Sequence, residues 1–246
     1  MDSFPEQEIV RPDWTFADLA VFGTFFALTL LILPWAIVSI LAGFIPGLTI
    51  DNIPGIAQIL IQGALNLIWV GFIFFLIKSI HHRSIRESLH WFPSRKYGVA
   101  RLIFLGVTLA VIALLVSSRF PPDQATPIEK LVESRGSLYL LILFGIFFAP
   151  ITEEIMFRGF FFGVISSLRG DRLAVPSTAL LFALLHAPQL KGSWAGIGLI
   201  FIVGYVLSIL RQRSNSLVPS FIVHTAYNSM LFGAGALSAL LERAHH

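Results

Sequence analysis

The chain has 246 residues, of which 56% are hydrophobic and 13% are charged, and its mean hydropathy is +0.81. Soluble domains carry about 25% charged residues, so the composition indicates one integral membrane domain, 1–246, rather than a soluble protein. The net charge of +3 comes without a basic, aromatic-rich face, which argues against nucleic-acid binding, and the absence of cysteine excludes disulfides and thiolate chemistry.

Apolar runs long enough to cross a bilayer, which takes about 20 residues, recur along the whole chain. We predict an all-α, polytopic transmembrane helix bundle of about seven spans (six to eight), near 18–42, 56–78, 101–118, 137–168, 173–190, 195–211 and 217–236. Thr15 and Asp18 before the first run have the spacing of a capping box, and Trp14 suits a membrane interface. The first residues are acidic and lack a basic n-region, so we expect the first span to be an anchor rather than a cleaved signal.

The fourth run is too long for one simple crossing, yet no turn signal divides it. We therefore predict one long helix over 137–168, kinked at Pro150. Basic residues then fall on the same side of the membrane, in the loops after spans two, four and six: Lys78, Arg83, Arg86, Arg95, Lys96, Arg101, Arg169, Arg172, Arg211 and Arg213. By the positive-inside rule the N-terminus is cytoplasmic and the C-terminus outside, in the plasma membrane of a prokaryote or the endoplasmic reticulum of a eukaryote. His81 and His82 are expected in a solvated loop on that side.

Three charges stand in the apolar stretch "APITEEIMFRGFFFG", at Glu153, Glu154 and Arg158. Ionisable groups in the hydrocarbon are costly, and those found there are usually functional. Glu154 and Arg158 are spaced i, i+4 with the acid first, the favourable order for an ion pair. Glu153 lies about 100° around the helix from Glu154, so it is predicted to face a different partner.

Three further polar residues, His186, His224 and Asn228, stand in the later spans. At about 1.5 Å of rise per residue they fall roughly 16–22 Å from the basic loops, in the same polar layer as Glu153 at roughly 24 Å. A carboxylate beside a histidine can take a proton from water, and His224 with Asn228 can present donors to an oxyanion. No serine or threonine is comparably placed, which disfavours a serine hydrolase.

Three motifs carry a family resemblance: "EEIMFR" has the form EExxxR, "FALLH" the form FxxxH and "HTAYN" the form HxxxN. In this order, within membrane helices, they resemble the CPBP family of CAAX prenyl endopeptidases and bacteriocin-processing or Abi-type membrane proteins. The resemblance covers residues 137–236, the motif-bearing helices, and leaves 1–136 as peripheral spans. It implies an intramembrane glutamic endopeptidase without a cofactor or metal. Its substrate would be a membrane-associated peptide or lipidated protein, because the family removes a C-terminal tripeptide from a prenylated cysteine.

The same resemblance implies a role for each motif residue. Glu153 would be the general base for water, and His186 would orient that water. His224 and Asn228 would bind the oxyanion, while the other motif residues, Glu154, Arg158 and Phe182, would support the geometry.

Two other functions remain open on the residues alone. Glu153, His186 and His224 could form a His₂Glu zinc site of a membrane metalloprotease, although no HExxH pair is present. Intramembrane carboxylates and histidines also build proton-coupled transporters or scaffolds, although no inverted repeat is visible. A polar stripe on span two, Gln58, Gln62 and Asn66, is interpreted as contacts between helices or the lining of a substrate groove.

Overall fold

The computed structural model describes residues 14–94, 96–120, 135–191 and 193–244, and within these ranges every regular element is helical. The α-helices are α1 (Phe16–Ala42), α2 (Gly55–Phe75), α3 (Ile85–Ser88), α4 (Val99–Arg119), α6 (Arg135–Leu143), α7 (Ala149–Glu154), α8 (Phe162–Arg169), α9 (Asp171–His186), α10 (Trp194–Ser214) and α11 (Val218–Ala244). Short 3₁₀ segments are η1 (Ile50–Asn52) and η5 (Ala187–Leu190). The π-helical segments are η2 (Leu76–Ile80), η3 (Phe144–Phe148) and η4 (Ile155–Phe161).

The predicted polytopic all-α bundle is confirmed. Six described helices are long and apolar enough to cross a membrane: Phe16–Ala42, Gly55–Ile80, Val99–Arg119, Gly136–Arg169, Asp171–Leu190 and Trp194–Ser214. They match the first six predicted spans to within three residues at either end. The seventh predicted span corresponds to α11, a helix of 27 residues that is not among these six, so a seventh crossing stays a prediction. The protein is therefore an integral, multi-pass membrane protein.

The fourth span is one continuous helix from α6 through α8, as predicted, and it is not regular. The π-helical segment η3 ends directly before α7, and Pro150 stands in the first turn of α7. Proline lacks the N–H that an α-helix would use there, so the chain departs from α geometry at this point. The second π-helical segment, η4, follows Glu154 directly. π-Helical turns are rare and frequently occur at functional sites.

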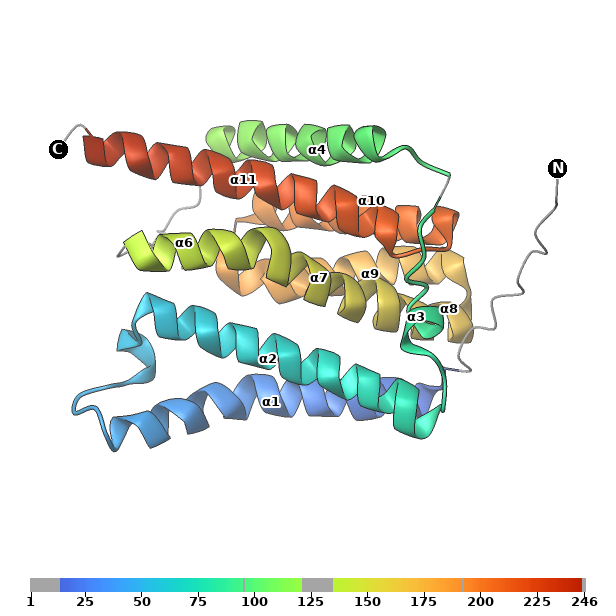
Figure 1. The fold of residues 1–246 in the computed structure, drawn as a ribbon, viewed down its shortest axis with the longest axis horizontal. Helices are drawn as coiled ribbons and strands as arrows, with labels where there is room; N and C mark the ends of the chain where they lie inside the picture. The colour runs from blue at the N-terminus through green and yellow to red at the C-terminus, as the bar shows by residue number, and fades with distance from the viewer. Residues whose placement is uncertain (1–13, 95, 121–134, 192, 245–246) are drawn as a thin grey trace.

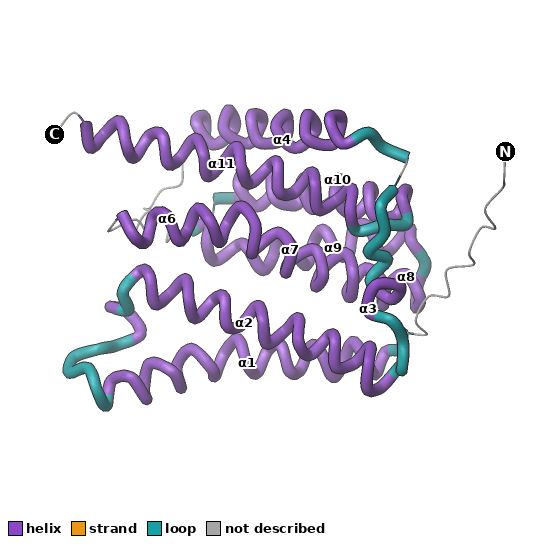
Figure 2. Tube along the Cα trace, in the orientation of Figure 1, coloured by secondary structure: helices purple, strands orange, loops and turns teal. Residues whose placement is uncertain are grey.

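The long α6–α8 helix lies in the middle of the bundle (Figures 1 and 2). It contacts α2 on one side and α9 and α11 on the other, while α4 packs along α11 and α9 along α10. A single residue, Gly170, joins α8 to α9 and has the positive φ of 81° that glycine adopts readily. This tight turn lays α9 beside the long helix.

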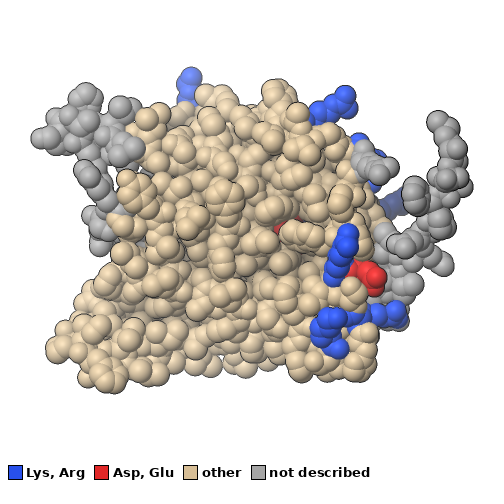
Figure 3. Space-filling view, in the orientation of Figure 1, with Lys and Arg blue, Asp and Glu red and all other residues tan. Residues whose placement is uncertain are grey.

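Basic side chains gather mainly at the end of the bundle where α1 begins, and the flank between the two ends is almost free of charge in this view (Figure 3). The helix α11 ends at the opposite end of the bundle from the start of α1 (Figure 1). Arg95 and residues 121–134 lie outside the described residues.

The start of α1 confirms the predicted capping box: the Thr15 hydroxyl accepts from the Asp18 N–H at 3.3 Å, and the Thr15 N–H donates to Asp18 Oδ2 at 2.8 Å. His81 and His82 lie between helices, as predicted; His82 is exposed, and the partly buried His81 places its Nε2 2.9 Å from Asp18 Oδ1. Trp14 is buried edge-on against His81 and Phe160.

Candidate active site

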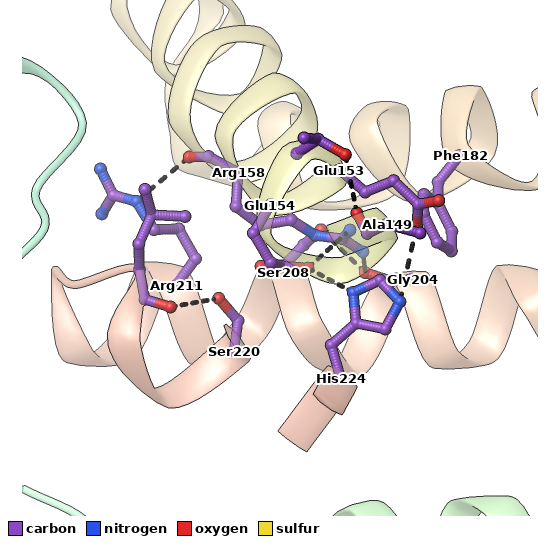
Figure 4. Close-up of polar contacts among 12 residues, drawn as sticks. Ala149, Glu153, Glu154, Arg158, Phe182, Gly204, Ser208, Arg211, Ser220 and His224 are labelled. Atoms are coloured by element: carbon purple, nitrogen blue, oxygen red, sulfur yellow. Dashed lines mark hydrogen bonds and ion pairs between the residues drawn. The ribbon is translucent and has the colours of Figure 1, made fainter. Parts of the chain in front are cut away.

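The motif residues come from three neighbouring helices near the middle of the bundle. Glu153 and Glu154 end α7, and Arg158 follows in η4. Phe182 and His186 stand in the last turn of α9, and α11 supplies His224 and Asn228. Figure 4 shows His224 facing the helix that carries both glutamates.

The predicted ion pair between Glu154 and Arg158 is confirmed. Arg158 Nη1 lies 3.1 Å from Glu154 Oε1, and neither side chain is exposed at all. The guanidinium also donates from Nη2 to the Gly204 carbonyl at 2.9 Å. Its charged carbon lies 4.6 Å from the centre of the Phe182 ring, which adds a cation–π contact. A buried charge needs this many partners to remain ionised.

His224 lies between the two glutamates. Its Nδ1 is 3.0 Å from Glu154 Oε1, and its Nε2 is 3.5 Å from Glu153 Oε2. The glutamates differ in access, because the Glu153 side chain is 18% exposed whereas that of Glu154 is fully buried. One carboxylate is therefore fixed in an ion pair, and the adjacent one faces the histidine while remaining accessible.

His186 is positioned by its own helix. Its Nδ1 lies 2.7 Å from the Phe182 carbonyl oxygen, which can only accept, so Nδ1 carries the proton and Nε2 is left for another partner. Among the described contacts, no hydrogen bond or ion pair joins His186 to Glu153. The Phe182 ring stands between the two histidines, with its centre 4.4 Å from that of His186 and 5.8 Å from that of His224. Phe182 thus packs against both imidazoles, as its predicted supporting role requires.

Asn228 turns one amide N–H away from the glutamates. Its Nδ2 donates to the Gly145 carbonyl at 2.8 Å, in the π-helical segment η3. In a π-helix the Gly145 carbonyl would accept the N–H of residue 150, which is a proline and has none, so the Asn228 amide supplies this carbonyl with a donor. The amide has a second N–H, and the oxyanion role expected of Asn228 stays a prediction.

The zinc ligands considered from the sequence are Glu153, His186 and His224. Within the described ranges no three histidine, aspartate or glutamate side chains converge into a group with metal-binding geometry. His224 and Glu153 face one another, but His186 is directed to its own backbone.

Arg211 is a residue of the site that sequence reasoning misplaced. It was assigned to a loop on the basic side, but it lies inside α10 and is only 4% exposed. Its Nε donates to the Arg158 carbonyl at 3.2 Å, which ties α10 to the motif helix. The sequence did not distinguish the buried Arg211 from the more exposed Arg213, because hydropathy does not locate the last residue of a span.

Comparison with known proteins agrees with the three motifs. Residues 135–230 match the family model described as type II CAAX prenyl endopeptidase Rce1-like. The resemblance to CAAX prenyl endopeptidases is confirmed. The matched region contains all seven motif residues and the whole site described above.

Two curated relatives were found. The membrane-embedded CAAX protease MroQ of Staphylococcus aureus is 24% identical over 235 residues, covering 85% of this chain and 92% of that protein. The UPF0177 protein YxdF of Lactococcus lactis is 31% identical over 91 residues, covering 37% of this chain and 46% of that protein. The chain thus spans about half the length of this second relative. No solved structure matches.

Over the region that holds the site, the chain is therefore similar to proteins described as membrane-embedded CAAX proteases and CAAX prenyl endopeptidases.

Proposed function

We propose that this protein is a glutamate-dependent intramembrane endopeptidase, in which Glu153 activates the water that attacks a peptide bond. The observation that carries the proposal is the position of His224, with Nδ1 3.0 Å from Glu154 and Nε2 3.5 Å from Glu153. A base and an electrophile side by side are what amide hydrolysis without a covalent nucleophile requires.

The charges of the cluster support this assignment of roles. The Glu154 carboxylate can only accept, so it orients His224 with a proton on Nδ1. Two carboxylates and the Arg158 guanidinium together carry one negative charge, which is costly in an apolar interior. The proposed mechanism requires a proton on each ring nitrogen of His224, which would make the four groups neutral together.

The reaction follows from these states. Glu153 takes a proton from water as the water oxygen attacks the scissile carbonyl carbon, and the carbonyl oxygen becomes an oxyanion. The Nε2–H of His224 donates to that oxyanion, where the second N–H of Asn228 is the other expected donor. Glu153 then transfers its proton to the leaving nitrogen as the C–N bond breaks. The Nε2 of His186, the ring nitrogen that does not contact the Phe182 carbonyl, is assigned to orient the water, as its motif implies.

For the substrate, we propose a membrane-associated, prenylated CAAX-type peptide. This rests on the family description and on the printed name of the Staphylococcus aureus relative. The basic end of the bundle is assigned to the cytoplasm, which puts the start of α1 there, in the plasma membrane of a prokaryote.

The test uses purified protein and a Glu153→Gln variant with matched thermal melting in detergent. Both are incubated with a quenched farnesylated CAAX peptide and with the same peptide lacking the farnesyl group. We expect the parent to cleave the farnesylated peptide and the variant to lose about 10²–10⁴-fold in rate, the range for a missing general base. Glu87→Gln, at an exposed glutamate of α3, is the matched control and should cleave normally.

Three results would contradict parts of the proposal. Full cleavage by Glu153→Gln would refute the assignment of Glu153 as the general base. Equal cleavage of both peptides would show that the prenyl group is not required, while the proposal of a protease would stand. Loss of activity in EDTA that zinc restores would favour the metalloprotease with Glu153, His186 and His224 as ligands.

A further inference from the structure

A chain of polar side chains crosses from α2 to the helix that carries Glu153. Gln62 Nε2 donates to Asn66 Oδ1 at 3.1 Å, and Asn66 Nδ2 donates to Thr152 Oγ1 at 3.2 Å. Asn66 and Thr152 are each only 4% exposed, whereas Gln62 is half-buried. The third residue of the predicted stripe, Gln58, is not part of this chain, because it donates to the carbonyl of Ile53, just before α2.

The chain ends on the backbone one helical turn before Glu153. The Thr152 hydroxyl lies 3.0 Å from both the Phe148 and the Ala149 carbonyl oxygens, to either of which it donates. In an α-helix the Ala149 carbonyl accepts the N–H of the residue four positions later, which is Glu153. The same turn contains Pro150, which supplies no N–H, and it follows the π-helical segment η3. The backbone that presents Glu153 is therefore irregular and needs support from outside its own helix.

The three donors follow one another in a single order: Gln62 donates to Asn66 within α2, Asn66 donates across to Thr152, and Thr152 donates to the backbone of its own helix. Asn66 uses its carbonyl oxygen for Gln62 and its amide for Thr152, so neither end of the side chain is left for another orientation. In an apolar interior an unpaired amide or hydroxyl is costly, which favours this one arrangement of the three side chains. It fixes the rotation of α7 about its axis relative to α2, and with it the direction of the Glu153 side chain.

We propose that Gln62, Asn66 and Thr152 form a positioning relay that holds Glu153 at its working distance from His224. The inference rests on the proposed role of Glu153 as general base. None of the three residues needs to touch the substrate. Removing the relay lets α7 rotate or shift, so the 3.5 Å between Glu153 and His224 is no longer maintained. A displacement of about 1 Å at reacting groups can cost on the order of 10²-fold in rate.

The experiment compares Asn66→Leu, Thr152→Val and the double variant with the parent, using the peptide that the parent cleaves. Each single change keeps the number and branching of the side-chain heavy atoms and removes the buried hydrogen bond. We expect kcat to fall about 10–100-fold with KM within a factor of about two, and the pH–rate profile to shift because the base has moved. The double variant should be no slower than the slower single variant, because both break the same link.

Matched controls separate the relay from general effects of losing a hydroxyl. The Thr108 hydroxyl, on an exposed face of α4, donates to the Phe104 carbonyl of its own helix at 2.8 Å. Thr108→Val removes this hydroxyl and should leave kcat unchanged. Thr152→Ser keeps the hydroxyl that accepts from Asn66, so it should retain at least about half of the parent kcat. If Asn66→Leu does not fold, Gln62→Leu at the half-buried end of the relay replaces it, with Gln58→Leu as its control.

The outcomes distinguish the relay from the function on which it rests. Normal kcat in Thr152→Val, equal losses in Thr152→Ser and Thr152→Val, or additive losses in the double variant would overturn the relay. If Glu153→Gln still cleaves the peptide, the proposed function fails, whatever the relay variants do. Loss in Glu153→Gln together with normal rates in the relay variants refutes the relay alone.

Discussion

The helix α11 carries His224, and its distance from the glutamates depends on how closely α4 approaches behind it. Gly106 of α4 faces this contact. A Cβ added at Gly106 would lie 2.5 Å from the Val223 carbonyl oxygen and 2.7 Å from the Ala226 Cβ. These atoms belong to the backbone and to a side chain without rotamers, so no side-chain rotation can relieve the clash.

We therefore predict that Gly106→Ala displaces α11 and impairs catalysis. Ordinary contacts at such a Cβ begin at 3.4 Å, so α11 must shift by about 1 Å away from α4. Val223 directly precedes His224, so the shift reaches the imidazole that faces both glutamates. A displacement of this size predicts a fall in kcat on the order of 10²-fold. Overpacking costs about 1–3 kcal/mol of stability, partly offset by the preference of helices for alanine over glycine.

The assay measures kcat, KM and the detergent melting temperature of Gly106→Ala beside Gly71→Ala. At Gly71 of α2 no atom lies within 4 Å of the added Cβ, so this control should keep both activity and melting temperature. Wild-type kcat in Gly106→Ala would refute the conclusion that the α4–α11 contact sets the position of His224. An equal loss in Gly71→Ala would show that the effect belongs to glycine replacement in general.

Three further substitutions test other parts of the site and its support. Glu154→Gln leaves Arg158 buried without its counter-ion, so thermal unfolding in detergent should show a loss of about 3–5 kcal/mol; a variant as stable as the parent would contradict the structural role of this pair. Phe182→Leu removes the ring that packs against Arg158 and both histidines, so about 1–2 kcal/mol of stability and part of kcat should be lost, and unchanged values for both quantities would count against it. Asp18→Ala removes the capping carboxylate and the His81 ion pair at the end of α1, and should cost about 1–2 kcal/mol in the same unfolding assay with kcat unchanged; a large fall in kcat would show that this end is coupled to catalysis.

The helices were predictable because a bilayer imposes a length on every span, and apolar runs of that length are visible in the sequence. The Glu154–Arg158 pair was predictable for a similar reason, since i, i+4 spacing alone brings the side chains together. The capping box of Thr15 and Asp18 is also local. Each of these features depends on residues within one helix.

Contacts between helices were harder to predict. The sequence indicated Glu153 beside His186, whereas Glu153 faces His224 and His186 bonds its own backbone. Depth along each helix can be counted from the loops, but rotation about the axis depends on close approaches such as Gly106 against Val223. The π-helical segments change the rotation again, and no residue type marks them. A buried Arg211 was missed because hydropathy locates the end of a span only to within a turn.

The charged groups of the site are divided between two helices, and this division explains how an apolar chain accommodates them. Glu154 and Arg158 neutralise each other within one helix, so the long helix can enter the bilayer with one excess negative charge, that of Glu153. His224 arrives on another helix and contacts both carboxylates only once the bundle is packed. The more accessible carboxylate therefore acquires its partner only in the packed bundle. Because that partner is an imidazole, the contact that stabilises the folded bundle also places a hydrogen-bond donor beside the proposed base.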